Sequence, residues 1–549
     1  MVRRLVPGVM VVAARTRPAA VVSSAVAVSL AAGVLLAGAL GPWPGAPARA
    51  VPATVAVTGG QVSGIPVEGT VEYLGIPFAA GGARFAPPGP GPSWPGVRSA
   101  DRHGPACPQT AFLPVAAPPG TEDCLNIDVY VPARPTGEPL PVMVFFHGGG
   151  YTTGANSHYA PTAMVARGDV IVAVPNYRLG PLGFLSLPEL AAESGGATGT
   201  TGIQDQQAAL RWVRDNATAF GGDPDDVTIF GESAGGGSVC AHLGAPASAG
   251  LFHKAVVQSG SCVQSPVAPL TREESFTRSA RFAERVGCGD PATRLACLRA
   301  LPLTVLLDGA EVPVEESGAP TWLPGIDGVV LTRPLADALR ESARPIPIIV
   351  GSNGNEGAQI VAEAEFARGR IPDAASVDGY VRRTFGGDAD AVLAHYPIAR
   401  YPSPAVAQSV IVTDGLFACP ALATGRLARE SGYPLWQYEF DQAPFGANPV
   451  LPGAFHAAEL LYLFSSVLGV PLPWTGDSAV FAERMRRWWT DFAHTGDPNG
   501  HGSPRWPAWP RRDDPRADGP VLTMRAEGSA VSDDFAARHH CSFWDELSR

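Results

Sequence analysis

The chain has 549 residues, of which 46% are hydrophobic and 17% are charged, so it has ample material for a folded core and is not a disordered protein. Its formal net charge is −11 and Lys254 is its only lysine, which excludes nucleic acid as an expected partner. Because Lys254 lies in no phosphate-binding loop, the same count argues against P-loop and Schiff-base chemistry.

The first fifty residues differ from the rest of the chain. Arginines precede an apolar run at residues 21–40, and the small residues at 48–50 suit a signal peptidase. We predict that residues 1–50 are a signal peptide. Its five arginines are its only charged residues, so its removal changes the formal net charge of the chain from −11 to −16. The alternative is an uncleaved membrane anchor, but the Ala and Ser content of the run argues against a permanent span. Residues 51–549 show no internal repeat and are expected to form a single secreted domain without stable membrane association.

Short runs of apolar and β-branched residues recur through this domain and are typical of buried strands. They lie at residues 141–146, 170–174, 227–230, 255–257, 346–350 and 435–440. Helical patterns separate many of them, as at residues 205–217, where Ala, Leu, Trp and Val recur at about every 3.6 residues. This alternation predicts an α/β fold with a mostly parallel sheet and helices on both faces.

A glycine-rich sequence, His147-Gly148-Gly149-Gly150, follows the first of these strands. Residues without side chains allow consecutive backbone N–H groups to point at one oxygen, as acyl transfer requires for its tetrahedral intermediate. We therefore expect Gly149 and Gly150 to donate to an oxyanion. The alternative is an ordinary flexible loop.

A GxSxG sequence, Gly231-Glu232-Ser233-Ala234-Gly235, follows the strand at 227–230 and precedes a helix start rich in small residues. This strand, sharp turn and helix are what a nucleophile elbow of the α/β-hydrolase fold requires. Ser233 is therefore the candidate nucleophile. The N–H of Ala234 would lie at a helix N-terminus, where it is a third candidate donor to the oxyanion. A glycine-rich turn with a solvated serine is the alternative.

Chain order in this fold is nucleophile, acid and then histidine, with the acid and the histidine on loops after late strands. Glu356 follows the strand at 346–350 in a short loop and is the candidate acid, with Asp327 and Asp414 as rivals. His456 follows the strand at 435–440 and is the candidate base. Later histidines, which follow no strand of comparable quality, are the rival bases: His494, His539 and His540.

Metal chemistry is not expected. His456 and Glu459 stand three residues apart, but neither an HExxH sequence nor a second cluster supplies further ligands. All eight cysteines lie after the predicted signal and none forms a CxxC pair, which suits disulfides in an oxidising compartment better than a zinc site. We predict no metal and no cofactor.

Several segments resemble the type-B carboxylesterase/lipase family, which includes cholinesterases and bacterial para-nitrobenzyl esterases. The similarity runs from about residue 54 to 545. Its segments are Glu122–Pro132, Asn176–Phe184, Gly202–Gln207, Phe220–Pro224, Gln258–Gly260 and Thr495–Asn499.

The resemblance implies a serine carboxylesterase with the triad Ser233, Glu356 and His456. It also implies that Glu232 and Ser259 lie beside the acid and the base, and that Glu459 is a buried supporting carboxylate. The family's three disulfides would be Cys107–Cys124, Cys288–Cys297 and Cys419–Cys541. Cys240 and Cys262 are left over and flank the elbow region, so we propose a fourth bridge between them.

The segment between the first two cysteines departs from relatives in the family. Residues 108–123 contain no tryptophan, whereas cholinesterases hold a quaternary ammonium against a tryptophan there, so choline esters are not the expected substrate. Prolines at 114, 118 and 119 disfavour the amphipathic lid of a lipase, which predicts small, short-chain esters as substrates. The rival functions are a non-catalytic adhesion protein and a thioesterase, carbamate or amide hydrolase. The oligomeric state stays open.

Overall fold

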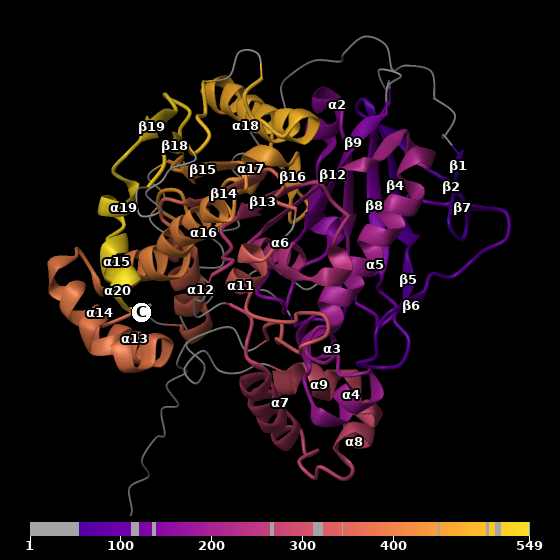
Figure 1. The fold of residues 1–549 in the computed structure, drawn as a ribbon, viewed down its shortest axis with the longest axis horizontal. Helices are drawn as coiled ribbons and strands as arrows, with labels where there is room; N and C mark the ends of the chain where they lie inside the picture. The colour runs from indigo at the N-terminus through magenta and orange to yellow at the C-terminus, as the bar shows by residue number, and fades with distance from the viewer. Residues whose placement is uncertain are drawn as a thin grey trace, which may run out of the picture. The chain divides into compact units, whose positions relative to one another are not determined.

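The computed structural model describes residues 54–110, 120–133, 139–263, 268–310, 322–342, 344–369, 371–446, 448, 451–500, 504–510 and 518–547. The predicted signal peptide lies outside these residues, as does most of the segment in which we predict no lid. Within the unit from Val51 to Arg549, strands run through the middle and helices surround them (Figure 1).

An eleven-stranded sheet forms the centre, in the order β19-β18-β15-β14-β13-β12-β9-β11-β8-β4-β3. Its seven neighbouring parallel strands are β18 (Val521–Met524), β15 (Leu435–Phe440), β14 (Ile348–Asn353), β13 (Lys254–Gln258), β12 (Gly222–Glu232), β9 (Leu140–Phe146) and β11 (Ile171–Pro175). Antiparallel strands flank them: β8 (Asn126–Pro132), β4 (Thr70–Pro77) and β3 (Ile65–Val67) at one edge and β19 (Ala530–Ser532) at the other. The predicted strands and the α/β-hydrolase fold are thereby confirmed.

Both faces of the sheet are buried, which explains why its central strands are continuously apolar. Along β9, Val142, Val144 and Phe146 face one hydrophobic core, while Met143 and Phe145 face another. The first core includes residues of α5 (Thr201–Asn216), α6 (Ala234–Gly244) and α16 (Cys419–Glu430). The second includes residues of α2 (Thr162–Gly168), α17 (Leu460–Leu463) and α18 (Gly476–Thr495).

The strand order determines where a ligand can bind. After β9 the chain first adds β11 on one side and then returns to add β12 on the other. Loops that leave neighbouring parallel strands in opposite directions open a crevice at the carboxyl ends of those strands. The glycine-rich loop after β9 and the Ser233 turn after β12 lie at this switch point.

All four predicted disulfides are present: Cys107–Cys124, Cys240–Cys262, Cys288–Cys297 and Cys419–Cys541. One helical run in the described part of the chain, Pro404–Glu430, has the length and apolar composition of a membrane span. Its most apolar window is 83% buried inside the protein, as expected of a core helix.

Candidate active site

Ser233 occupies a strained turn between β12 and α6. Its φ of 59° and ψ of −122° are unfavourable for a residue with a side chain, so packing must hold it there. The flanking glycines explain how: a Cβ on Gly235 would lie 1.9 Å from the carbonyl oxygen of Phe146, and one on Gly231 would lie 2.5 Å from the backbone of Gly235. Only glycines let strand, turn and helix approach this closely.

The loop after β9 closes against this turn. A Cβ on Gly148 would lie 3.1 Å from that of Ser233, and Gly149 and Gly150 have φ values of 105° and 61° that favour glycine. In the described part of the chain, the backbone N–H groups of Gly149 and Gly150 donate to no protein acceptor. Ala234 is the first residue of α6, so its N–H has no partner within the helix. Three free N–H donors therefore come from the two loops that meet at Ser233.

His147 begins this loop and is fully buried. Its ring stacks on Tyr177 with 4.4 Å between ring centroids, and the Tyr177 hydroxyl donates to the His147 carbonyl at 2.7 Å. Burial lowers the pKa of His147 to about 4, so its imidazole is neutral at neutral pH and supports the loop without charge.

Glu356 lies in the turn after β14 and is fully buried. Its Oε1 accepts hydrogen bonds from the Ser259 hydroxyl at 2.6 Å and from the Asn353 N–H at 2.7 Å. Its Oε2 lies 2.6 Å from Nδ1 of His456. The carboxylate is therefore held by two donors, which leaves its second oxygen to orient the imidazole ring.

The other ring nitrogen of His456, Nε2, lies 3.3 Å from Oε1 of Glu232, the residue directly before Ser233. The imidazole thus connects Glu356 to the turn that carries Ser233. Burial alone lowers the pKa of His456, but the charges of Glu232 and Glu356 outweigh burial and raise it. Burial raises the pKa of Glu232 well above its usual range, while the charge of His456 acts in the opposite direction. Each group therefore favours the charged form of the other.

Comparison with known proteins shows to which family the chain belongs. Residues 51–544 match the profile of the carboxylesterase family. The chain belongs to this family. Para-nitrobenzyl esterase of Bacillus subtilis is 34% identical over 82% of this chain and 91% of its own length. Cocaine esterase of Oryctolagus cuniculus is 36% identical over 82% of this chain and 88% of its own length.

Solved structures agree with the sequence comparison. One of a PNB esterase superimposes with a TM-score of 0.75 at 31% identity and covers 89% of this chain and 99% of its own. One of a thermophilic PNB esterase gives a TM-score of 0.74 at 29% identity with the same coverage. This carboxylesterase-family chain is therefore a carboxylic ester hydrolase with the α/β-hydrolase fold.

Glu459, a third acidic residue near His456, is fully buried and makes no direct contact with the imidazole among the described interactions. Its oxygens accept hydrogen bonds from Gln258 Nε2 at 3.0 Å and from Asn353 Nδ2 at 2.7 Å. Burial and the charge of Glu356 raise the pKa of Glu459 to about 7. Asn353 donates its backbone N–H to Glu356 and its side chain to Glu459, so it connects the two carboxyls.

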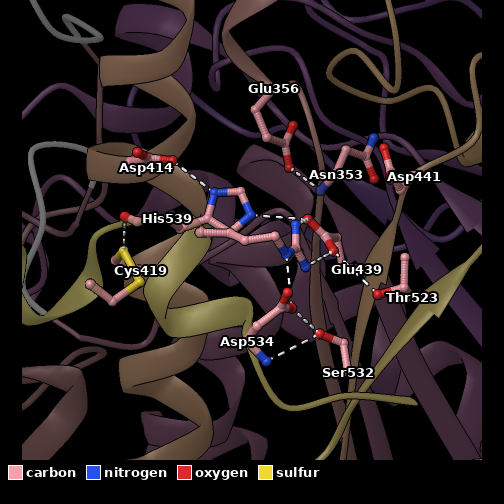
Figure 2. A network of polar contacts seen from close by, with 12 residues as sticks. Asn353, Glu356, Asp414, Cys419, Glu439, Asp441, Thr523, Ser532, Asp534 and His539 are labelled. Carbon is pink, nitrogen blue, oxygen red and sulfur yellow. Dashed lines mark hydrogen bonds and ion pairs between the residues drawn. A yellow bond between two sulfur atoms is a disulfide. The ribbon is translucent and has the colours of Figure 1, made fainter. Parts of the chain in front are cut away.

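Two rival residues of the carboxylesterase chain come together elsewhere. His539 Nδ1 lies 2.7 Å from Asp414, and its Nε2 lies 2.9 Å from Glu439 (Figure 2). Both ring nitrogens of His539 are therefore hydrogen-bonded to carboxylates, whereas only Nδ1 of His456 has a hydrogen bond among the described interactions. The sequence alone left this pair open as a base and an acid.

The remaining rivals also have structural roles. Asp327 accepts hydrogen bonds from the Thr200 hydroxyl at 2.8 Å and from consecutive backbone N–H groups at residues 329–331, which is a turn-capping pattern. His494 is bound to the carbonyl of Gly168 at 2.9 Å. His540 contacts the ring of His395, with 5.1 Å between centroids. None of these contacts involves the Ser233 turn.

Three residues near His456 and its acidic neighbours were not predicted from the sequence: Asn353, Gln258 and Phe417. Phe417 packs on the imidazole of His456 with 4.8 Å between ring centroids. Gln258 Oε1 accepts a hydrogen bond from Trp489 Nε1 at 3.2 Å, and Gln258 Nε2 donates one to Glu459. The positions of Asn353 and Gln258 at the carboxyl ends of β14 and β13 were the available signal, because functional side chains gather at that edge of a parallel sheet. In the described residues, no group of three His, Cys, Asp or Glu side chains could hold a metal ion.

Proposed function

We propose that this protein is a secreted serine carboxylesterase in which Ser233 is the nucleophile, His456 the general base and Glu356 the acid that orients the base. The observation that carries the proposal is the chain of contacts from Glu356 Oε2 to His456 Nδ1 at 2.6 Å, with Nε2 of the same ring facing the Ser233 turn. A base whose far nitrogen is held by a carboxylate presents its near nitrogen in the tautomer that accepts a proton.

The reaction begins when His456 Nε2 takes the Ser233 proton as Oγ attacks the ester carbonyl. The imidazolium that forms is stabilised by Glu356 and by Glu232, the two carboxyls that raise the pKa of His456. His456 then gives its proton to the leaving alcohol, and an acyl-Ser233 intermediate remains. Water, activated by the same imidazole, attacks the acyl group and restores the free serine.

The negative oxygen of each tetrahedral intermediate is placed among the N–H groups of Gly149, Gly150 and Ala234. Among the described residues these donors have no protein acceptor, so no protein hydrogen bond there must break before they bind the oxyanion. The strained φ and ψ of Ser233 support its role as the nucleophile, because they push Oγ out of the turn toward the crevice.

Ser259, Glu232 and Glu459 are proposed as supporting groups. Ser259 donates to the oxygen of Glu356 that does not face His456, and so fixes the rotation of that carboxylate. Glu459 holds Asn353, which donates its own N–H to Glu356. This layer of hydrogen bonds keeps the acid in one orientation during both proton transfers.

Small carboxylic esters are the proposed substrates. Relatives of the chain carry the names para-nitrobenzyl esterase, cocaine esterase and acylcarnitine hydrolase, which refer to different esters. We propose that this protein acts on short-chain esters and requires no cofactor. Four disulfides among eight cysteines support an oxidising location, in agreement with export by residues 1–50.

The proposal is tested with a chromogenic short-chain ester and the variants Ser233→Ala, His456→Ala and Glu356→Gln. Each should lower kcat by about 10⁴ or more while the thermal unfolding midpoint stays that of a folded protein, because triad members act as one unit. Asp327→Asn is the matched control for the acid, since it removes a buried carboxylate away from Ser233, and it should lose far less activity. Near-normal turnover in Glu356→Gln would place the acid elsewhere, and a folded wild type without esterase activity would favour the adhesion alternative.

A further inference from the structure

The long core helix beside the candidate acid contains a π-helical turn. It runs from Thr413 to Ala418, between α15 (Pro404–Val412) and α16, and all six of its residues are buried. A π turn adds one residue to a helical turn at some cost in hydrogen-bond geometry, and such turns are frequent at functional sites. No residue of this turn belongs to the proposed triad, so the triad itself does not explain why the core contains a π turn.

One end of the turn holds the segment that carries Glu356. Thr413 Oγ accepts a hydrogen bond from the N–H of Gly357 at 3.0 Å and donates to the carbonyl of Ser409 at 2.8 Å. A Cβ on Gly357 would lie 2.1 Å from that same carbonyl oxygen, so the backbone after the acid packs directly on the helix. On the other side of the acid, Asn355 accepts the Ser409 hydroxyl at 2.8 Å.

The other end of the turn touches the candidate base. Phe417 lies four residues after Thr413 and packs its ring on the imidazole of His456, with 4.8 Å between centroids and 49° between planes. Glu356 determines the direction of Nδ1, and Phe417 limits rotation and tilt of the ring about that bond. The same turn therefore contacts the residue directly after the acid and the ring of the base.

The turn is itself anchored on its far side. Asp414 accepts a hydrogen bond from His539 at 2.7 Å (Figure 2). It also accepts one from the Tyr396 hydroxyl at 3.0 Å. The disulfide Cys419–Cys541 ties the first residue of α16 to the C-terminal helix α20 (Cys541–Leu547). His539 and Cys541 come from the C-terminal end of the chain, which lies far from the nucleophile in sequence.

We propose that the π turn positions the base and the acid relative to one another, with Thr413 and Phe417 as positioning residues and the Asp414–His539 contact fixing the turn. This inference rests on the proposed triad. A displacement of the base of about 1 Å can cost about 10²-fold in rate, so a turn that restrains two members of the relay can affect kcat without touching the substrate.

The test compares two changes at Thr413, one that removes the hydroxyl and one that keeps it. Thr413→Val keeps the shape but removes the acceptor of the Gly357 N–H, whereas Thr413→Ser keeps the hydroxyl. We expect Thr413→Val to lower kcat about tenfold or more with KM changed less than about twofold, and Thr413→Ser to recover most of the loss. Equal kcat in wild type and Thr413→Val would overturn the inference.

Phe417→Ala is compared with Leu422→Ala, which removes a fully buried side chain from α16 beyond the turn. Both variants should lower the unfolding midpoint, because both leave a cavity. Only Phe417→Ala should also lower kcat per folded active site, with the sites counted by an organophosphate that labels the nucleophile. Equal kcat losses in the two variants would show that Phe417 is only a core residue and would overturn its proposed role in positioning His456.

The same data separate failure of this inference from failure of the proposed triad. If Glu356→Gln is inactive while Thr413→Val and Phe417→Ala turn over like the wild type, the triad stands and the positioning role is wrong. If Glu356→Gln is active, there is no relay at Glu356 for the turn to position, and both are wrong.

Discussion

The ion-pair network around His539 makes a quantitative prediction about stability. This imidazole is 6% exposed and lies between Asp414 and Glu439. Burial alone lowers its pKa, but hydrogen bonds and charge from the two carboxylates outweigh burial and raise the pKa of His539 to about 9. Burial also opposes ionisation of Glu439, yet hydrogen bonds from His539 and Arg538 lower the pKa of Glu439 to about 2. Glu439 therefore stays charged throughout the range in which His539 titrates.

The sign of the effect follows from linkage. The folded protein holds the His539 proton up to a pKa of about 9, whereas the unfolded chain releases it near the ordinary value of 6.5. The stability that His539 contributes is thus fully present below 6.5 and is lost as the pH rises through about 9. The difference between the two values corresponds to about 3 kcal/mol of unfolding free energy. Arg538 on Glu439 and the Tyr396 hydroxyl on Asp414 keep their partners in place across this window.

The perturbation is His539→Gln, which keeps polar atoms but does not titrate. Urea unfolding at about pH 6 and about pH 10 should show the wild-type advantage over the variant falling by up to about 3 kcal/mol at the higher pH. The control is His242→Gln. Burial lowers the pKa of His242 to about 3, so its contribution is fully present above 6.5 and is lost progressively as the pH falls from 6.5 to about 3, which means that it should not fall between about pH 6 and about pH 10. An advantage of His539 that is the same at both pH values would show that it is neutral in the folded protein and would refute this reasoning.

Two further predictions concern the disulfides and the substrate. Replacing Cys240 and Cys262 by Ala should cost about 3 kcal/mol of stability and also lower kcat, because that bridge joins the nucleophile helix to the segment after β13. The Cys288 and Cys297 double variant should cost a similar amount, about 3 kcal/mol, without a change in kcat, and equal kcat losses in the two would remove any link to the site. On esters of graded acyl length, turnover should be hyperbolic and highest for acetyl to butyryl groups. A jump in rate at the solubility limit with long-chain triglycerides would instead indicate a lipase.

The parallel centre of the sheet could be predicted from the sequence because strands buried on both faces are apolar along their whole length. The antiparallel strands β4 and β8 could not be predicted in the same way, because they contain buried carboxyls that interrupt the apolar pattern. In the structure Glu72 accepts a hydrogen bond from Thr162 at 3.1 Å, and Asp128 accepts one from the N–H of Gly75 at 2.7 Å. These carboxyls find their hydrogen-bond partners up to 90 residues away along the chain, and the local sequence does not indicate which residues those partners are.

The candidate site is a second example of long-range contacts that the local sequence does not reveal. Two histidine–carboxylate pairs, His456 with Glu356 and His539 with Asp414, are separated by 100 and 125 residues along the chain. Order along the chain favoured the first pair, yet spacing could not show what the second one does. The difference lies at the second ring nitrogen. In His539 that nitrogen is hydrogen-bonded to Glu439 at 2.9 Å, whereas in His456 it makes no hydrogen bond among the described interactions and lies 3.3 Å from Oε1 of Glu232, the residue before Ser233. A general base needs one nitrogen held and the other directed at a nucleophile, so the contacts at both nitrogens, and not the presence of a neighbouring acid, separate a candidate catalytic histidine from a structural one.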